Sequence, residues 1–420
     1  NRTLSILLAF TLTALLSTAV GSLYAPIELR GQSYFDRSLR AWITLVIGLS
    51  FFVSAVWMNR DEEDLKFSLK WLFVGLVLHI VWGGIQAVGL NIGLRGELNQ
   101  IQTLFSTRGL VKNKRISGLA YEPSWLAAQL ASLYIPWLFA ALVARYRMSR
   151  FKWLEPSLFL GGLVILLLTY SRSGLAILFG AAFVTFMAAG SEVMRNVWDW
   201  YRAGFRGSQN KGRSGSMQAW GSRIVVSLVL IGAVAGAGLF LADKGYIAAF
   251  WNSSAESLFD YAVDVYLGPR LAYVTAALSA FQSHPLTGVG LGASGFYMYQ
   301  NMPDWSLSGI PEISRQLSPV SNLYPNPKNL YVRLLAETGL PGFTLYMSFL
   351  FASLACAWMN LRRNTQLHRL LGAAGLFSVI AVAMQGISQD SFAVPEIWIN
   401  LGVLAGMTSI AFESSHRETK

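Results

Sequence analysis

Ten long, continuous apolar runs constrain the fold of this chain more than any other feature. Each run is close to the roughly 20 residues that a helix needs to cross a bilayer. Lipid cannot satisfy backbone polar groups, and the runs do not alternate with polar residues, so they predict an all-α polytopic membrane protein. The composition agrees, because only 13% of the residues are charged where a soluble domain carries about 25%. The predicted spans are 4–20, 41–58, 71–90, 124–143, 154–170, 173–190, 224–242, 342–358, 370–386 and 393–412.

The fifth and sixth runs are separated only by the polar stretch 169–174. One helix through both runs would be about 25 Å too long for the bilayer at 1.5 Å per residue. A tight hairpin at 171–174 is therefore expected. The chain begins with Asn1 rather than Met, which leaves open how many spans precede it in the whole protein.

The basic residues of the short connections predict the orientation. Arg145, Arg147, Arg150 and Lys152 share one connection, and Arg362, Arg363 and Arg369 lie at another, so these ends are expected in the cytoplasm. Residues 1–241 then form N-terminal transmembrane helices with a cytoplasmic basic loop at 191–223. Residues 242–337 form a large periplasmic loop with short helices, and residues 338–420 form C-terminal helices and a cytoplasmic tail.

Several classes of partner are not expected. Most of the net charge of +11 is explained by the excess of Lys and Arg in the connections predicted to face the cytoplasm. The sequence has no basic face interleaved with aromatic residues outside the spans, so nucleic-acid binding is not expected. The single cysteine, Cys356, lies inside a span and excludes an intrachain disulfide. The outer connections carry no Asp-rich or His cluster with metal-ligand spacing, so neither a metal nor a cofactor is expected.

Cations on the periplasmic side suggest an anionic substrate. Arg172 lies at the predicted hairpin, where it either snorkels to lipid headgroups or binds an anion. Arg270 lies in the first turn of a helix predicted from Pro269 to Gln282, where the dipole disfavours a cation, so an anion is expected nearby. Arg and Lys in such numbers suit a diphosphate.

Glu122 stands where the fourth span begins, before Pro123 and Ser124. Pro in the first helical turn and a carboxylate at the positive end of the dipole give one explanation. A general base with a cationic neighbour, Arg115, is the other.

The large loop ends in two further motifs. Glycines 290, 292 and 295 follow His284; without a βαβ unit they predict a tight turn rather than a dinucleotide site. Next, Asn326 is expected to cap a helix that starts at Pro327 and ends at Gly339. Within this helix Asn329, Arg333 and Glu337 form a polar stripe, either as a surface pair worth under about 0.5 kcal/mol or as a substrate-facing row.

These motifs resemble those of O-antigen ligases and Wzy-type O-antigen or exopolysaccharide polymerases. The resemblance covers about residues 110–412 and is carried by Glu122-Pro-Ser, Thr169-Tyr-Ser-Arg-Ser-Gly, His284-Pro-Leu-Thr-Gly-Val-Gly-Leu-Gly and Lys328-Asn-Leu-Tyr-Val-Arg-Leu-Leu-Ala-Glu-Thr-Gly-Leu-Pro-Gly. It implies a metal-independent glycosyltransferase of the bacterial inner membrane that uses an undecaprenyl-diphosphate-linked glycan at the periplasmic face. The acceptor would be a glycan or lipid-linked unit. Membrane lipids and a chain-length regulator protein are the other implied partners.

The resemblance also implies site roles. The family's diphosphate arginines correspond to Arg172 and Arg270, and Lys328 stands where family ligases usually have histidine. This difference and the Glu-Pro-Ser element favour a polymerase over a ligase. The expected site has Glu122 as base with Glu337 second. Arg172, Arg270 and Lys328 bind the donor diphosphate, Asn329 and Tyr331 position the glycan, and Arg115 and Arg333 are further substrate-binding residues.

Two functions of other classes stay open at this point. A transporter of lipid-linked glycans would place charges inside its spans and interrupt helices in both halves. A noncatalytic scaffold would use the large loop as an interaction surface.

Overall fold

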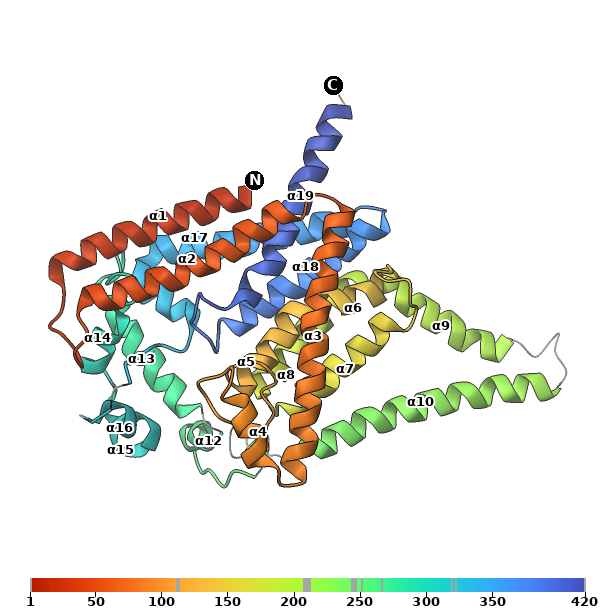
Figure 1. Cartoon of the computed structure of the whole chain (residues 1–420), viewed down its shortest axis with the longest axis horizontal. Coiled ribbons are helices and arrows are strands. Elements are labelled where there is room, and N and C mark those ends of the chain that lie inside the picture. Colours follow the sequence, from red (N-terminus) through yellow and green to blue (C-terminus); the bar gives the residue numbers. More distant parts are fainter. Residues whose placement is uncertain are drawn as a thin grey trace.

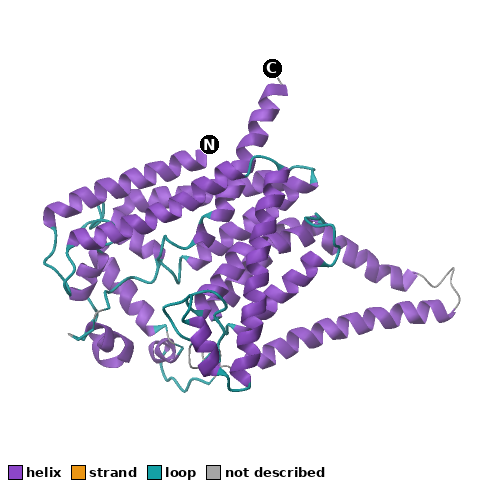
Figure 2. Ribbon diagram, in the orientation of Figure 1, coloured by secondary structure: helices purple, strands orange, loops and turns teal. Residues whose placement is uncertain are grey.

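The computed structural model confirms the all-helical class. It describes residues 2–110, 114–206, 213–242, 248–250, 252–265, 267–318, 320–321 and 323–418. Throughout these ranges the regular structure is helical, with no strand (Figure 2). Seven helices of the described part are long and apolar enough to cross a membrane.

One group of helices contains both ends of the chain. Helices α1 (Arg2–Gly21), α2 (Tyr34–Met58) and α17 (Leu330–Leu361) run side by side in Figure 1, and α19 (Ile399–Glu418) packs along α2. Their shared core is aromatic, with fully buried rings of Phe10, Phe52, Tyr346, Phe349 and Trp398. Rings of this size bury about 150–250 Å² each and fix how closely the helices approach.

A second group forms around α18 (Gln366–Gln385). This helix packs against α17 on one side and against α6 (Ile135–Ala144) and α8 (Arg172–Ala189) on the other. Its buried run of Gly372, Ala373, Ala374 and Gly375 allows the close approach that small residues give to membrane helices. The group is completed by α3 (Glu62–Asn91), α4 (Arg95–Gln102), α5 (Pro123–Gln129), a π-helical turn (Leu130–Tyr134) and α7 (Leu154–Leu168).

Seven of the ten predicted spans correspond to helices that are long and apolar enough to cross a membrane. The fifth predicted span corresponds to α7, which has only 15 residues. The seventh and tenth fall in α10 (Arg213–Ala242) and α19, parts of whose side chains lie outside the described structure. The basic stretch 191–223 was expected as a loop, but its described residues are helical, in α9 (Ser191–Arg206) and the start of α10.

The large loop contains the short helices that were expected. They are α12 (Leu258–Asp264), α13 (Gly268–Ser283), α14 (Ser294–Gln300), α15 (Asp304–Gly309) and α16 (Pro311–Leu317). Helix α13 turns its alanine face, Ala272, Ala276, Ala277 and Ala280, into the protein and packs on α14 and α17. The loop thus lies across the end of the bundle at which α17 begins (Figure 1).

The expected hairpin between α7 and α8 is confirmed. Helix α7 ends at Leu168, and Tyr170 adopts a left-handed φ of 49°. Ser171 then caps α8, because its hydroxyl accepts a hydrogen bond from the Gly174 N–H at 3.3 Å. The left-handed backbone at Tyr170 ends the path of α7, and the Ser171 cap starts α8, so the two helices are separate.

The predicted start of the closing helix at Pro327 is wrong. Helix α17 begins at Leu330, and Asn329 is its cap, accepting hydrogen bonds from the Tyr331 and Val332 N–H groups at 3.0 and 3.1 Å. Lys328 precedes the cap with a left-handed φ of 49°. Asn329 can satisfy two end N–H groups at once, and the helix therefore begins after it.

The predicted end at Gly339 and the glycine turn are confirmed, and they meet. Gly339 interrupts α17 with φ 64° and ψ −172°. The N–H groups of Val289 and Gly290 donate to the carbonyls of Ala336 and Glu337 at 2.9 and 3.0 Å. A Cβ on Gly290 would lie 1.9 Å from the Tyr34 hydroxyl, so only glycine permits this approach.

Candidate functional site

A cavity of about 310 Å³ lies where the large loop covers the bundle. Segments distant in sequence form its walls: the start of α5, the start of α8, the start of α13, residues 326–328 and the connection 388–391. Its described lining residues are Glu122, Ser124, Trp125, Ala128, Ser173, Ile177, Arg270, Asn326, Lys328, Ser388, Gln389, Asp390 and Ser391. The cavity therefore brings together three of the residues predicted from the sequence, Glu122, Arg270 and Lys328.

Arg270 is one of the two cations in the cavity, and it is half-buried. Its Nη1 donates to the Ser388 carbonyl at 3.2 Å. Burial lowers the pKa of Arg270 from its usual value, while the carboxylates of Glu312 and Asp390 oppose that shift. The anion that was expected beside this first-turn arginine is thus supplied by these two side chains.

Lys328 joins the loop to the connection after α18. Its Nζ lies 2.6 Å from Glu312 Oε1 and 4.6 Å from the centre of the Tyr273 ring. Its backbone N–H donates to Asp390 Oδ2 at 3.0 Å. The left-handed backbone at Lys328 thus directs N–H and side chain to two different acidic partners.

Glu122 is directed toward the cavity rather than toward its own helix. It occupies the N-cap position of α5, with Pro123 at the first helical position, but its carboxylate makes other contacts. One oxygen accepts from Ser124 Oγ at 2.5 Å, and the other pairs with Arg108. The predicted neighbour, Arg115, donates from Nε to the Thr169 carbonyl at 2.8 Å, and the ion pair of Glu122 is with Arg108.

Asp390 is the main functional candidate that the sequence did not reveal. It lies in the connection between α18 and α19 and lines the cavity. Burial raises the pKa of Asp390, and the Arg333 charge and the Lys328 N–H oppose this. The available signal was the polar run Ser388 to Ser391 between two apolar spans, with one carboxylate in it.

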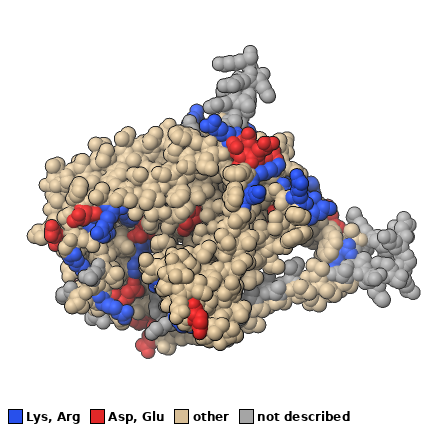
Figure 3. Space-filling model, viewed as in Figure 1, with Lys and Arg blue, Asp and Glu red and all other residues tan. Residues whose placement is uncertain are grey.

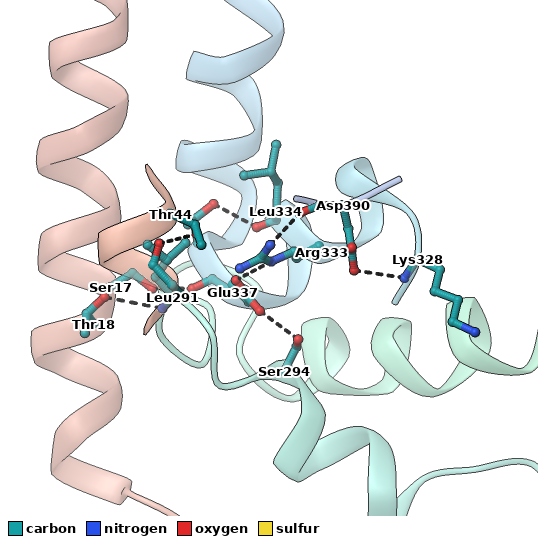
Figure 4. A network of polar contacts seen from close by, with 12 residues as sticks. Ser17, Thr18, Thr44, Leu291, Ser294, Lys328, Arg333, Leu334, Glu337 and Asp390 are labelled. Atoms are coloured by element: carbon teal, nitrogen blue, oxygen red, sulfur yellow. Dashed lines mark hydrogen bonds and ion pairs between the residues drawn. The ribbon is translucent and has the colours of Figure 1, made fainter. Parts of the chain in front are cut away.

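Arg333 and Glu337 form a buried ion pair next to Asp390, as Figure 4 shows. Arg333 Nε lies 2.9 Å from Glu337 Oε2, and the two side chains are 12% and 2% exposed. Ser294 Oγ donates to the other Glu337 oxygen at 2.8 Å, and Arg333 Nη1 donates to the Asp390 carbonyl. The interpretation as a surface pair is therefore wrong: the pair supports Asp390 from inside the protein.

The remaining predicted residues hold the elements around the cavity and are not among its described lining residues. Arg172 Nη1 donates to the Val265 carbonyl at 2.8 Å, and its guanidinium lies 5.1 Å from the Phe250 ring centre. Tyr331 donates from its hydroxyl to the Ala383 carbonyl at 2.6 Å. Asn329, as the N-cap, lies before the helix rather than on a stripe with Arg333 and Glu337.

Replacing Arg172 with alanine is expected to slow glycan transfer about tenfold, because a hydrogen bond from a charged group contributes about 1.5–3 kcal/mol. The contact with Val265 docks the first part of the large loop. Initial rates in proteoliposomes measure the loss, and limited proteolysis within 248–265 reports the loosened loop. Arg172→Lys keeps a donor and is the matched control. An Arg172→Ala variant with unchanged rate and cleavage would exclude this role.

Comparison with known proteins identifies the middle part of this chain. Residues 157–347 match the family model described as O-Antigen ligase (Wzy_C). This region belongs to the O-antigen ligase and Wzy-type family. No curated protein matches the chain. With its apolar helices, this Wzy-type chain is a multi-pass membrane protein and a glycosyltransferase of the broad ligase and polymerase type.

The matched region of this Wzy-type chain covers only part of the cavity. It contains Arg270 and Lys328, together with Arg172 and the Arg333–Glu337 pair. Glu122 precedes it, and Asp390 follows it. Both carboxylates that line the cavity thus come from outside the matched region.

Proposed function

We propose that this Wzy-type protein polymerises O-antigen or exopolysaccharide repeat units. The donor is an undecaprenyl-diphosphate-linked glycan, and the reaction takes place at the periplasmic face of the bacterial inner membrane. The observation that supports the proposal most is the single cavity in which two cations and two carboxylates meet. A glycosyl transfer from a diphosphate needs both kinds of group.

The two cations bind the donor diphosphate. Arg270 offers a planar guanidinium that can donate two parallel hydrogen bonds, and Lys328 adds a point charge. Lys328 already pairs with Glu312, but these side chains are 36% and 52% exposed, and an exposed pair contributes under about 1 kcal/mol. Exchange of Glu312 for a phosphate oxygen is therefore inexpensive.

Glu122 is the general base. The hydroxyl of the acceptor attacks the anomeric carbon of the first donor sugar and transfers its proton to the Glu122 carboxylate. The bond from the anomeric carbon to the diphosphate oxygen breaks, and the electron pair leaves with the lipid diphosphate, where Arg270 and Lys328 stabilise it. Ser124 and Arg108 orient the carboxylate.

The other predicted residues act through their neighbours. Glu337 and Arg333 position Asp390 and the loop 386–394, and Asn329 and Tyr331 fix the start of α17. Arg115 and Arg172 hold the turn before α8 and the first part of the large loop. We assign these residues positioning roles around the diphosphate and the glycan.

Transfer to lipid A-core is the second candidate function, because the matching family carries the description O-Antigen ligase. Lys328 favours polymerisation, because it stands where the resemblance places a ligase histidine, and its ammonium group, which pairs with Glu312, suits phosphate binding better than the role of a base. The decisive experiment incubates the purified protein with lipid-linked repeat units, with and without lipid A-core. Long polyprenyl-linked chains support the polymerase, core-attached glycan supports the ligase, and translocation without a new bond supports a transporter.

Replacing Arg270 with alanine is expected to lower the transfer rate by about 100-fold, because one preorganised donor to developing charge is worth about 2.7–4 kcal/mol. Arg270→Lys keeps the positive charge but cannot donate two parallel hydrogen bonds, so a smaller loss of transfer rate is expected. Arg315→Ala is the matched control: Arg315 lies in α16 of the same large loop, outside the described lining of the cavity. Equal rates for the Arg270→Ala and Arg315→Ala variants would contradict the diphosphate site.

A further inference from the structure

A second polar cavity, also of about 310 Å³, lies at the other end of the same helices. The candidate site uses the first residues of α8 and the segment after α18, whereas this cavity uses the last residues of α8 and the first of α18. At 1.5 Å per residue, the 18 residues of α8 separate the two by about 27 Å. The second cavity is lined by Val143, Ala144, Ala188, Ala189, Ser191, Glu192, Leu361, Arg363, Asn364 and Arg369.

The charges around this cavity are strongly unbalanced. Glu192 is its one described carboxylate, and Arg369 Nη1 lies 2.8 Å from it. The pKa of Glu192 is held below its usual value by Arg369 and then by Arg195 and Arg145. Three arginines thus act on one carboxylate, and Arg363 adds a fourth cation in the wall. Figure 3 shows Lys and Arg side chains gathered at this end of the molecule.

The remaining groups of the cavity suit an anion with several oxygens. Arg363 lies in the connection just after α17, and Arg369 lies in the first turn of α18, so two guanidiniums line the cavity from neighbouring elements. Asn364 adds amide donors, and Ser191 begins α9, where unpaired N–H groups favour negative charge. The cavity volume is about ten times the roughly 30 Å³ of one water in the liquid, which leaves room for such a group.

Helix α9 provides an independent indication that this cavity lies at the level of lipid headgroups. Its exposed Met194, Val197, Trp198 and Tyr201 recur at the spacing of one helical face. Arg195 and Arg202 lie on other positions of the same helix. A helix with this distribution lies in the interface between headgroups and acyl chains, and it begins at the wall of the cavity.

We propose that this second cavity binds a phosphate group, either the headgroup phosphate of an anionic phospholipid or free phosphate. Arg363 and Arg369 each bind its oxygens with two parallel hydrogen bonds, and Glu192 competes with it for Arg369. Anionic lipid headgroups bind in pockets lined by Lys and Arg between membrane helices, at the end of the helices where such residues are concentrated. Phosphate binding here would tie together the ends of α6, α8, α17 and α18.

The test measures binding to the full-length protein in a neutral detergent, with short-chain phosphatidylglycerol and inorganic phosphate as separate probes. The double variant Arg363→Gln/Arg369→Gln is expected to weaken binding at least about tenfold, since charge-assisted bidentate contacts are lost. Glu192→Gln is expected to strengthen it about threefold to tenfold, because the competing carboxylate becomes neutral while the arginines stay. Arg147→Gln/Arg150→Gln, in the nearby α6–α7 connection and outside this lining, is the control.

Both probes can support the proposal, and they distinguish the source of the phosphate. Phosphatidylglycerol binding with this variant pattern identifies a lipid headgroup, and binding of inorganic phosphate with the same pattern identifies free phosphate. Equal affinities of the native protein and the Arg363→Gln/Arg369→Gln variant for both probes would overturn the proposal. Weaker binding by Glu192→Gln would also overturn it, even if the double arginine variant failed to fold. The experiment measures the affinity for each probe and requires no glycan transfer, so its result is independent of the function proposed above.

Discussion

Replacing Glu122 with glutamine is expected to lower the rate of glycan transfer by about 10²–10⁴-fold, the usual contribution of a general base. The glutamine keeps the size of the side chain and can still accept a hydrogen bond from Ser124. It cannot take up the proton of the acceptor hydroxyl. Initial rates of chain extension in proteoliposomes, at saturating donor and acceptor, measure the effect.

Two companion variants separate the base from its surroundings. Ser124→Ala removes one contact of the Glu122 carboxylate and is expected to cost less than tenfold, in line with about 0.5–1.5 kcal/mol for one hydrogen bond. Asp390→Asn tests the second carboxylate of the cavity. If Asp390→Asn abolishes transfer while Glu122→Gln leaves it within a few-fold of normal, Asp390 is the base and the assignment of Glu122 is wrong.

Replacing Arg333 with methionine is expected to destabilise the protein by about 3–5 kcal/mol, because removal of one partner leaves a buried charge uncompensated. Glu337 is 2% exposed and would keep the hydrogen bond from Ser294 and the weaker attraction of the Arg37 charge. Methionine fills a similar volume without charge. The midpoint of thermal unfolding in detergent, followed by loss of the monodisperse peak, reports the change.

The double variant Arg333→Met/Glu337→Leu is the matched control for this prediction. A buried pair replaced as a whole by apolar side chains is often neutral in stability, so the double variant is expected to regain most of the lost stability. It also removes the Arg333 hydrogen bond to the Asp390 carbonyl, and its transfer rate should stay reduced. A double variant that is no more stable than Arg333→Met would show that packing, rather than the buried charge, causes the loss.

The partners of the charged residues in the site could not be predicted from the sequence. Glu122 pairs with Arg108 although Arg115 begins the same motif, and Asp390 joins the cavity from a connection with no recognisable motif. The Arg333–Glu337 spacing fits an exposed helical face as well as a buried one, because periodicity within one helix does not show what covers it. The pair is buried by distant segments that pack against α17: α14, the glycine turn and the Phe392 ring.

The sequence by itself determined the helical membrane class, the break between α7 and α8, the glycine turn and the residue types of the site. These features depend on local properties: the length of apolar runs, the requirement that lipid imposes on the backbone, and the conformations open to glycine. The tertiary structure alone decided which connections between helices meet. The approach of Glu122, Arg270, Lys328 and Asp390 depends on how α5, α8, α13 and α18 pack, and packing between distant helices leaves no periodic signal in the chain.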